Sequence, residues 1–355
     1  MSPRRVGLAA AVVGVVAAGA AAGVAIERRA VGRARRAPDP YADEPFGSLH
    51  TAGRTVYADD GVPLHVEIEG DDADVPTVVF VHGFTLSMDC WHFQRRDLAG
   101  IGRVVFYDQR SHGASGRSPR EHATIDQLGS DLFAVLEAVA PRGPVVLVGH
   151  SMGGMTLLAL ADQHPELFAP DTGRVIGVAL VGTAAGAFAE TIFGIPGVVG
   201  RAVRPVAPGA IRAANRRAHL IEQGRRAGSD IAFLLTRKLS YGGDVPPSLV
   251  AFMERMVAAT PVEVMTEFFD TFLQHDKLEA LSVLKGVPTL ILCGDDDKLT
   301  PVRNSHVMAE ALPDAELVVV PGAGHMVMLE RPSVVNAALR RLVERAAEQP
   351  QAASA

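Results

Sequence analysis

VVLVGHSMGG, residues 145–154, is an apolar run followed by the pattern Gly-x-Ser-x-Gly around Ser151. The run at 145–148 predicts a strand, and residues 152–164 have the spacing of a helix. Glycines beside Ser151 permit a sharp turn between the two, in which the serine adopts strained backbone angles and its hydroxyl is exposed. The pattern occurs once in the chain, and its context predicts a nucleophilic serine.

Strand and helix patterns alternate from residue 55 onward, which predicts an α/β fold with helices on both faces of a sheet. Short runs at 56–58 and 64–68, joined by a turn, predict an antiparallel hairpin that opens the sheet. Six β-branched apolar runs predict parallel strands buried on both faces: 77–81, 104–107, 145–148, 175–181, 289–293 and 317–320. Helical spacing occurs at 125–140, 152–164, 302–312 and 333–348. The expected sheet therefore has eight strands, most of them parallel.

One long stretch, residues 187–260, interrupts this alternation, because it is helical in pattern, rich in arginine and broken by prolines. We interpret it as a helical cap inserted after the sixth strand. The core then comprises residues 55–186 and 261–346, and residues 347–355 form a tail. Apolar cap residues such as Phe188 either line a site for a hydrophobic acyl or alkyl group or pack the cap on the core.

The first 36 residues form a separate segment. Arg4 and Arg5 precede an uncharged run of mainly Ala, Val and Gly at 6–26, and further arginines follow it. As a helix this run would span about 30 Å, the thickness of a bilayer core. We expect a cell-membrane protein with a single N-terminal membrane segment or signal anchor at 1–36 and a linker at 37–54. The arginines after the run favour a cytoplasmic catalytic domain, and a cleaved signal peptide with secretion is the alternative.

Composition narrows the partners of the chain. Its 34 basic and 40 acidic residues give a net charge of -6, which argues against nucleic acid as the main partner. Cys90 and Cys293 stand far apart without a Cys/His cluster, so neither a disulfide framework nor a metal site is expected. No cofactor is expected either. The arginine-rich part of the cap is either a solvated face or a surface that contacts a membrane. The sequence does not determine the oligomeric state.

A nucleophilic serine needs a base and an acid from elsewhere in the chain. Histidine exchanges a proton near neutral pH, and His325 follows the last expected strand on a Gly-Ala-Gly loop, at the sheet edge where ligands bind. Three consecutive residues, Asp295, Asp296 and Asp297, compete for the role of the acid after the strand at 289–293.

Residues 55–344 resemble the α/β-hydrolase fold family, more narrowly its cap-bearing serine esterase, lipase and haloperoxidase-like members. Five motifs at expected strand ends carry the resemblance: His82-Gly83-Phe84, Asp108-Gln109-Arg110-Ser111-His112-Gly113-x-Ser115, Gly149-His150-Ser151-Met152-Gly153-Gly154, Gly294-x-x-Asp297-x-x-x-Pro301 and Gly324-His325. The chain departs from the family at Ser111, where glycine is usual.

The resemblance implies a catalytic triad of Ser151, Asp297 and His325. The acid of the family lies three residues after the glycine and four before the proline, which selects Asp297 among the three aspartates. An alternative place for the acid, just after the sixth strand, begins at Gly182 and holds no carboxylate.

An oxyanion hole is also implied, formed by the backbone N–H groups of Phe84 and Met152, which would stabilise the negative charge of a tetrahedral intermediate. The side chains of Phe84, Trp91 and Phe93 either wall the pocket or belong to the ordinary core.

The first hypothesis is therefore an enzyme, a serine hydrolase that cleaves small-molecule carboxylic esters, with a hydrophobic or lipid-like acyl group, through an acyl-enzyme. The resemblance equally supports a cofactor-free haloperoxidase or perhydrolase, or a carbon–carbon bond hydrolase, on the same triad. A non-catalytic ligand-binding module is a third hypothesis, because fold alone does not prove function. Epoxide hydrolases and dehalogenases of the family are disfavoured, since they carry aspartate where this chain has Ser151.

Overall fold

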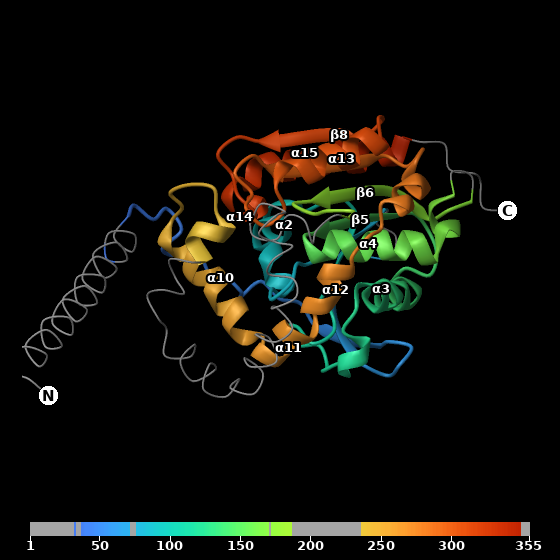
Figure 1. The fold of residues 1–355 in the computed structure, drawn as a ribbon, viewed down its shortest axis with the longest axis horizontal. Helices are drawn as coiled ribbons and strands as arrows, with labels where there is room; N and C mark the ends of the chain where they lie inside the picture. Colours follow the sequence, from blue (N-terminus) through green and yellow to red (C-terminus); the bar gives the residue numbers. More distant parts are fainter. Residues whose placement is uncertain (1–31, 33–36, 72–75, 170–171, 187–235, 349–355) are drawn as a thin grey trace, which may run out of the picture.

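The structure is a computed structural model that describes residues 32, 37–71, 76–169, 172–186 and 236–348. These residues form an eight-stranded sheet with the order β1-β2-β4-β3-β5-β6-β7-β8, flanked by helices (Figure 1). β1 pairs with β2, and β2 with β4, in antiparallel fashion, whereas all the other neighbouring strands are parallel. The predicted mostly parallel sheet with an opening hairpin is confirmed.

The strands are β1 (Gly53–Tyr57), β2 (Pro63–Glu69), β3 (Thr77–Val81), β4 (Arg103–Tyr107), β5 (Val145–His150), β6 (Val175–Val181), β7 (Thr289–Gly294) and β8 (Glu316–Val320). Two predicted strands, 77–81 and 175–181, have the predicted bounds. The four other parallel strands are one or two residues longer than predicted.

The α-helices are α2 (His92–Asp97), α3 (Ile125–Val139), α4 (Met152–Gln163), α10 (Pro247–Ala259), α11 (Val262–Glu267), α12 (Phe269–Gln274), α13 (Val302–Ala311), α14 (Val327–Glu330) and α15 (Pro332–Glu348). Short 3₁₀ segments are η1 (Met88–Trp91), η2 (Arg120–His122), η3 (Pro165–Phe168) and η5 (Glu279–Leu284). The four predicted helices of the core are thus present within about one residue of the expected ends.

Side chains of the buried strands alternate between the two faces of the sheet. Val78 and Phe80 of β3 join a cluster that includes residues of α2, α14 and α15. Val79 and Val81 of the same strand join a second cluster with residues of α3, α4 and α13. The sheet is therefore the middle layer between two hydrophobic cores.

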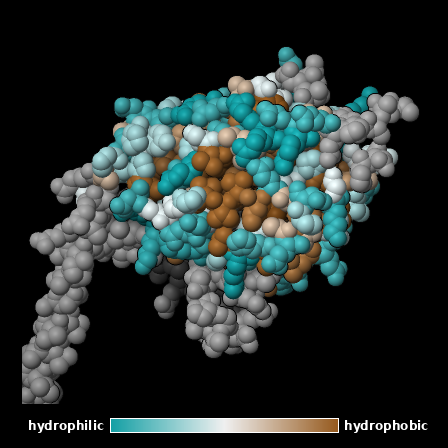
Figure 2. Space-filling model, turned by 90° about the horizontal axis from the view of Figure 1, so that it is seen from above, coloured by the Kyte–Doolittle hydropathy of each residue, from teal (hydrophilic) through white to brown (hydrophobic). Residues whose placement is uncertain are grey.

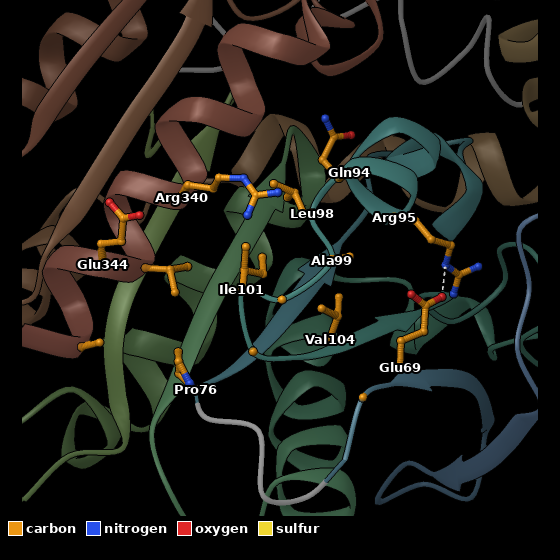
Figure 3. A pocket seen from close by; sticks show the side chains of 15 residues that line it. Glu69, Pro76, Gln94, Arg95, Leu98, Ala99, Ile101, Val104, Arg340 and Glu344 are labelled. Atoms are coloured by element: carbon orange, nitrogen blue, oxygen red, sulfur yellow. Dashed lines mark ion pairs between the residues drawn. The ribbon is translucent and has the colours of Figure 1, made fainter.

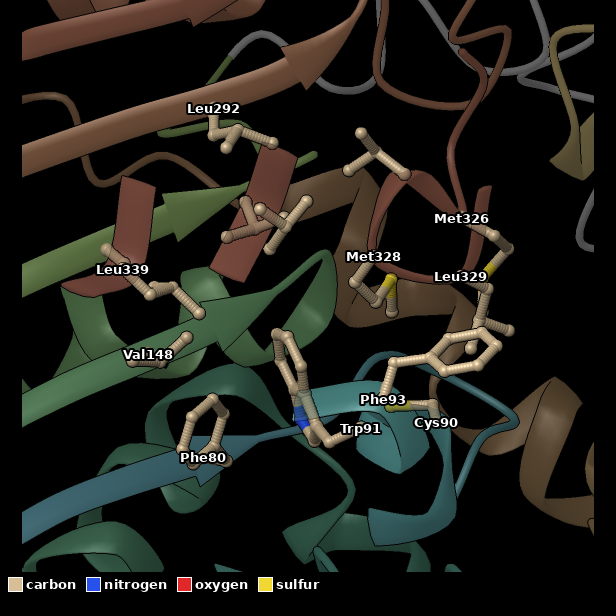
Figure 4. Close-up of a cluster of buried hydrophobic side chains, with 14 of the residues drawn as sticks. Phe80, Cys90, Trp91, Phe93, Val148, Leu292, Met326, Met328, Leu329 and Leu339 are labelled. Carbon is tan, nitrogen blue, oxygen red and sulfur yellow. The ribbon is translucent and has the colours of Figure 1, made fainter. Parts of the chain in front are cut away.

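The first of these cores contains the only tryptophan of the chain. Trp91 is fully buried, and its ring lies 5.1 Å from that of Phe80 between centroids (Figure 4). Phe93 is also fully buried in this cluster. Trp91 and Phe93 therefore belong to the ordinary core and do not wall the pocket.

β8 lies at the edge of the sheet opposite β1. Its apolar residues Leu317, Val318 and Val319 are only half-buried, and Val307 of α13 and Val334 of α15 are exposed. Figure 2 looks down on this side of the molecule and shows apolar residues gathered in the middle of a mostly hydrophilic surface. The β8 side therefore carries an apolar surface patch.

Of the expected cap, residues 187–235 lie outside the described residues. In the remaining part, residues 236–240 are helical, and α10 packs on the first core through Phe252 and Met253. Phe46, in the expected linker, stacks on Phe252 with a centroid distance of 4.7 Å. The division into core, cap and tail stays a prediction.

The structure contradicts the expected membrane location as far as its described residues reach. None of the helices there is long and apolar enough to cross a membrane. The longest, α15, has 17 residues and carries charged side chains on its exposed face, whereas a span needs about 20 mostly apolar residues. The run at 6–26, on which the prediction relied, lies outside the described residues.

Candidate active site

Four parallel strands bring the predicted site segments to one edge of the sheet. Val81 at the end of β3 is in register with Gly149 of β5, and Gly294 at the end of β7 is in register with Val320 of β8. Because neighbouring parallel strands end at the same edge, the segments that follow them meet there. Ser151 follows β5 directly.

Ser151 occupies the strained turn that the sequence predicts. Its backbone angles are φ 53° and ψ -118°, in a region that L-residues seldom adopt. Its N–H donates to the carbonyl of Val181 at 2.9 Å. A Cβ on Gly153 would lie 2.2 Å from the carbonyl oxygen of Val81, so the start of α4 packs against β3 only because this residue is glycine.

Asp297 and His325 are hydrogen-bonded to each other. His325 Nδ1 lies 2.9 Å from Asp297 Oδ2, and the second carboxylate oxygen accepts the N–H groups of Leu299 and Thr300, both at 2.8 Å. The Thr300 hydroxyl lies 2.7 Å from Asp297 Oδ2 and 2.8 Å from the carbonyl of Gly182. The carboxylate is therefore fixed in orientation on every side.

The neighbouring aspartates have other partners. Asp296 is partly exposed and pairs with Lys298 at 3.0 Å, and Asp295 accepts the N–H of Gly322. Among the three aspartates, only Asp297 contacts an imidazole in the described part of the chain.

The charge state of Asp297 suits a carboxylate that orients an imidazole. Burial raises its pKa, but the positive charge of His325 and the hydrogen bonds from His325 and Thr300 outweigh burial, so its pKa lies below the usual value. An ionised Asp297 accepts the Nδ1–H of His325. The lone pair of the neutral imidazole is then on Nε2, the atom that would take up a proton from a nucleophile.

Ser151 and His325 line one cavity of about 170 Å³. Its walls are mostly apolar and are formed by Gly83, Phe84, Thr85, Leu86, His150, Met155, Met253, Phe269, Phe272, Leu299, Thr300 and Met326. No hydrogen bond joins the Ser151 hydroxyl to His325 among the described residues. Such bonds are often loose before a substrate binds.

The two predicted oxyanion donors flank the serine, Met152 in the chain and Phe84 in space, and Phe84 lines the cavity. Met152 is the first residue of α4, and Phe84 follows β3. Neither backbone N–H donates a hydrogen bond to another described residue. A Cβ on Gly83 would lie 3.2 Å from the Cβ of Ser151, so the loop after β3 passes directly over the serine. Both N–H groups are thus free for a ligand oxygen.

Three buried histidines brace the loops around the site. His82 donates Nδ1–H to the carbonyl of Gly83 at 2.7 Å, His112 bonds the carbonyl of Arg110, and His150 Nε2 bonds the carbonyl of His325 at 2.9 Å. Burial lowers the pKa of His82 to about 4 and that of His112 to about 3. Burial and the nearby His325 lower the pKa of His150 to about 3. All three are neutral in the folded protein near pH 7.

These histidines make stability depend on pH. In the unfolded chain each would bind a proton below about pH 6.5, whereas in the folded protein each stays neutral down to about pH 4, so stability is lost as pH falls through this window. We expect urea unfolding to show a loss of about 2 kcal/mol per histidine between pH 6.5 and pH 5. His112→Gln should flatten the slope, and the exposed control His306→Gln should leave it unchanged. An identical slope in the His112 variant would contradict this assignment.

Two features near the site were not predicted. Thr300, which contacts Asp297, stands three residues after it in the pattern Asp-x-x-Thr. This spacing is the feature of the sequence from which the contact could have been predicted. Ser111, where the family usually has glycine, adopts φ 65°, and its hydroxyl accepts the N–H of Ser118 at 2.9 Å. This side-chain hydrogen bond supports the left-handed backbone of the turn.

A larger cavity of about 730 Å³ lies elsewhere, between α2 and α15 (Figure 3). It is lined by the ion pair of Arg95 with Glu69 and by Arg340, and it contains no predicted site residue. Among the described residues, no three His, Cys, Asp or Glu side chains gather as a metal site. The smaller cavity at Ser151 is therefore the candidate active site.

Comparison with known proteins identifies the family of the chain. A model of the α/β-hydrolase family matches residues 78–338. The chain belongs to the α/β-hydrolase family. It is 28% identical over 294 residues to a non-heme haloperoxidase of Rhodococcus erythropolis, covering 81% of this chain and 98% of that protein.

Two further relatives extend the comparison. The chain is 28% identical to the mouse sn-1-specific diacylglycerol lipase, covering 76% of this chain and 82% of that protein. A solved thermophilic esterase from Thermogutta terrifontis is similar with a TM-score of 0.64 and 25% identity, covering 83% of this chain and 99% of the esterase. Proteins named for different activities therefore resemble this chain over most of its length.

Proposed function

We propose that the protein is a serine hydrolase that cleaves carboxylic esters through an acyl-enzyme, with Ser151 as nucleophile, His325 as base and Asp297 as the acid that orients it. The observation that carries the proposal is the shared cavity: a serine in a strained turn and an imidazole hydrogen-bonded to a buried carboxylate line the same walls. The esterase and lipase among its relatives support the same reaction.

Acylation would begin with attack of Ser151 Oγ on the ester carbonyl carbon. His325 Nε2 takes the hydroxyl proton, and Asp297 stabilises the imidazolium that forms. The carbonyl oxygen becomes an oxyanion, to which the N–H groups of Phe84 and Met152 donate. When the bond to the alcohol breaks, His325 returns the proton to the leaving oxygen, and an acyl-enzyme remains.

Deacylation would repeat these steps with water. His325 takes a proton from a water molecule as the water attacks the acyl carbon. The second tetrahedral intermediate uses the same two N–H groups. Its collapse releases the carboxylic acid and returns the proton to Ser151, so the enzyme is restored.

The cavity walls favour an apolar acyl group. Phe84, Met155, Met253, Phe269 and Phe272 surround the serine, and a volume of about 170 Å³ accommodates a small group. An alkyl chain that enters such a cavity gains hydrophobic free energy for each buried methylene.

We expect activity on p-nitrophenyl esters to rise about fourfold in kcat/KM per added methylene, until the chain fills the cavity. Phe272→Ala should move the optimum to longer chains, because it enlarges the cavity. Phe133→Ala, a partly buried phenylalanine of α3 that does not line the cavity, is the matched control and should keep the wild-type optimum. The assignment of this cavity to the acyl group would fail if Phe272→Ala left the optimum unchanged.

Treatment of the full-length protein with a fluorophosphonate, which reacts with nucleophilic serines, tests the proposal directly. We expect a covalent adduct on Ser151, located by peptide mass spectrometry, together with turnover of simple esters. A panel of esters, lactones and β-diketones then defines the reaction, since diketone cleavage without ester turnover would favour a carbon–carbon hydrolase. A lack of labelling together with a lack of turnover would reject the serine hydrolase.

A second candidate is perhydrolysis on the same residues, which the haloperoxidase among the relatives favours. Hydrogen peroxide would replace water in the attack on the acyl-enzyme and release a peracid. Halogenation that depends on a carboxylic acid and peroxide, measured beside ester turnover, separates the two activities.

A further inference from the structure

The loop between β8 and α14 carries His325, and its backbone is held from several sides. His150 Nε2 bonds the carbonyl of His325 at 2.9 Å, and the N–H of Met326 donates to the carbonyl of Ser240 at 3.0 Å. The place of the imidazole therefore depends on contacts of the backbone as well as on Asp297.

Glu330, the last residue of α14, adds a contact that the proposed reaction does not use. Its side chain is buried, with 9% of the residue exposed. One carboxylate oxygen accepts the N–H of Gly324 at 2.7 Å, and the other accepts the N–H of Gly242 at 3.0 Å. Burial raises the pKa of Glu330, and the two N–H groups oppose this shift. A buried carboxylate is costly unless such donors compensate it.

The two loops that Glu330 joins pack backbone against backbone. A Cβ on Gly324 would lie 2.5 Å from the nitrogen of Gly242, and a Cβ on Gly242 would lie 2.5 Å from the carbonyl carbon of Ala323. No side chain fits between them. A shift of one loop therefore displaces the other or breaks a bond to Glu330.

The turn at 241–243, which contains Gly242, leads into α10, and α10 forms a wall of the cavity. Tyr241 is buried, and its hydroxyl donates to the carbonyl of Leu249 in α10 at 2.8 Å. Met253, one turn further along α10, lines the cavity beside Ser151. The turn at 241–243 is thus tied to the helix that bounds the site.

We propose that Glu330 is a positioning residue that couples the His325 loop to the turn before α10. Its carboxylate holds the His325 imidazole in a fixed position relative to the wall of the cavity that α10 forms. The catalytic consequence rests on the proposed function, whereas the coupling of the two loops does not. Loss of the carboxylate would let the imidazole move relative to Ser151, and such a displacement slows catalysis steeply.

The test compares full-length wild type with Glu330→Ala, Glu330→Gln and the control Glu344→Gln, an exposed glutamate of α15. For p-nitrophenyl butyrate, Glu330→Ala should lower kcat about 100-fold and change KM less than about threefold. Gln keeps one acceptor oxygen and should recover part of the loss, leaving kcat about tenfold low. The control should match the wild type.

Titration with a fluorophosphonate counts the folded active sites, so each kcat refers to competent molecules only. A purely structural role would reduce the number of sites and the Tm but leave kcat per site unchanged. That result in Glu330→Ala would overturn the proposal.

Hydrogen exchange tests the coupling without any activity. Peptides that contain Gly324 and Gly242 should both exchange faster in Glu330→Ala than in the wild type and in Glu344→Gln. Faster exchange in only one of the two, or in neither, would overturn the coupling. Absence of ester turnover in the wild type would instead count against the proposed function, and the exchange result would still decide the role of Glu330.

Discussion

Ser151→Ala is expected to lower kcat for ester hydrolysis about a million-fold and to abolish fluorophosphonate labelling. Alanine removes the only oxygen that can form the acyl-enzyme at this turn. The fold should persist, because Ala and Ser are similar in size and the Ser151 side chain donates no hydrogen bond to another described residue. Residual turnover would come from binding and from the oxyanion donors alone. The measurement is steady-state kinetics with active-site titration.

Ser333→Ala, an exposed serine near the start of α15, is the matched control and should keep full activity and labelling at Ser151. A Ser151→Ala protein that turned over esters at a tenth of the wild-type rate would place the nucleophile elsewhere. Because a trace of wild-type contamination could mimic residual activity, the variant is assayed after exposure to the fluorophosphonate.

Asp297→Asn is expected to lower kcat about ten thousand-fold while the structure stays intact. In the Asn variant the amide oxygen would keep the N–H groups of Leu299 and Thr300, so the amide NH2 would face His325 Nδ1 and donate to it. The histidine would then carry its proton on Nε2, the wrong tautomer for a base, and would lose its charge partner. The bonds from Leu299, Thr300 and His325 to this carboxylate show how closely its geometry is fixed. The kinetics are compared at saturating substrate.

Asp296→Asn, one residue earlier, is the control for this variant. Asp296 pairs with Lys298 at the surface and contacts no imidazole among the described residues, so its substitution should change kcat less than about twofold. Equal losses in the two variants would mean that the acid had been assigned wrongly.

The strands of this fold are predictable from sequence because their signal is local. Residues 77–81 and 175–181 are apolar, rich in β-branched side chains and bounded by turn residues, and the structure has β3 and β6 there. α2 was not predicted, because six residues carry too little periodicity to show a helix. Phe46 lies in a proline-rich stretch that reads as a linker, and its stacking on Phe252 depends on a segment distant in the chain.

Part of the candidate site could be predicted from the sequence, and part could not. Ser151, Asp297 and His325 stand in motifs whose spacing is written in the sequence, and the structure brings the last two into contact. The roles of His150 and Glu330 had no such signal. Glu330 meets Gly242 across 88 positions of the chain, and only the approach of two folded loops creates that contact.

The ends of β6 and β7 meet at Asp297. A Cβ on Gly182, directly after β6, would lie 3.5 Å from Asp297 Oδ2 and 3.4 Å from the carbonyl oxygen of His325. Position 182 therefore lies beside the carboxylate that holds His325, although the two strand ends are far apart in the chain. A side chain at position 182 would contact both partners of the hydrogen bond that holds the imidazole, which ties the end of β6 to the site.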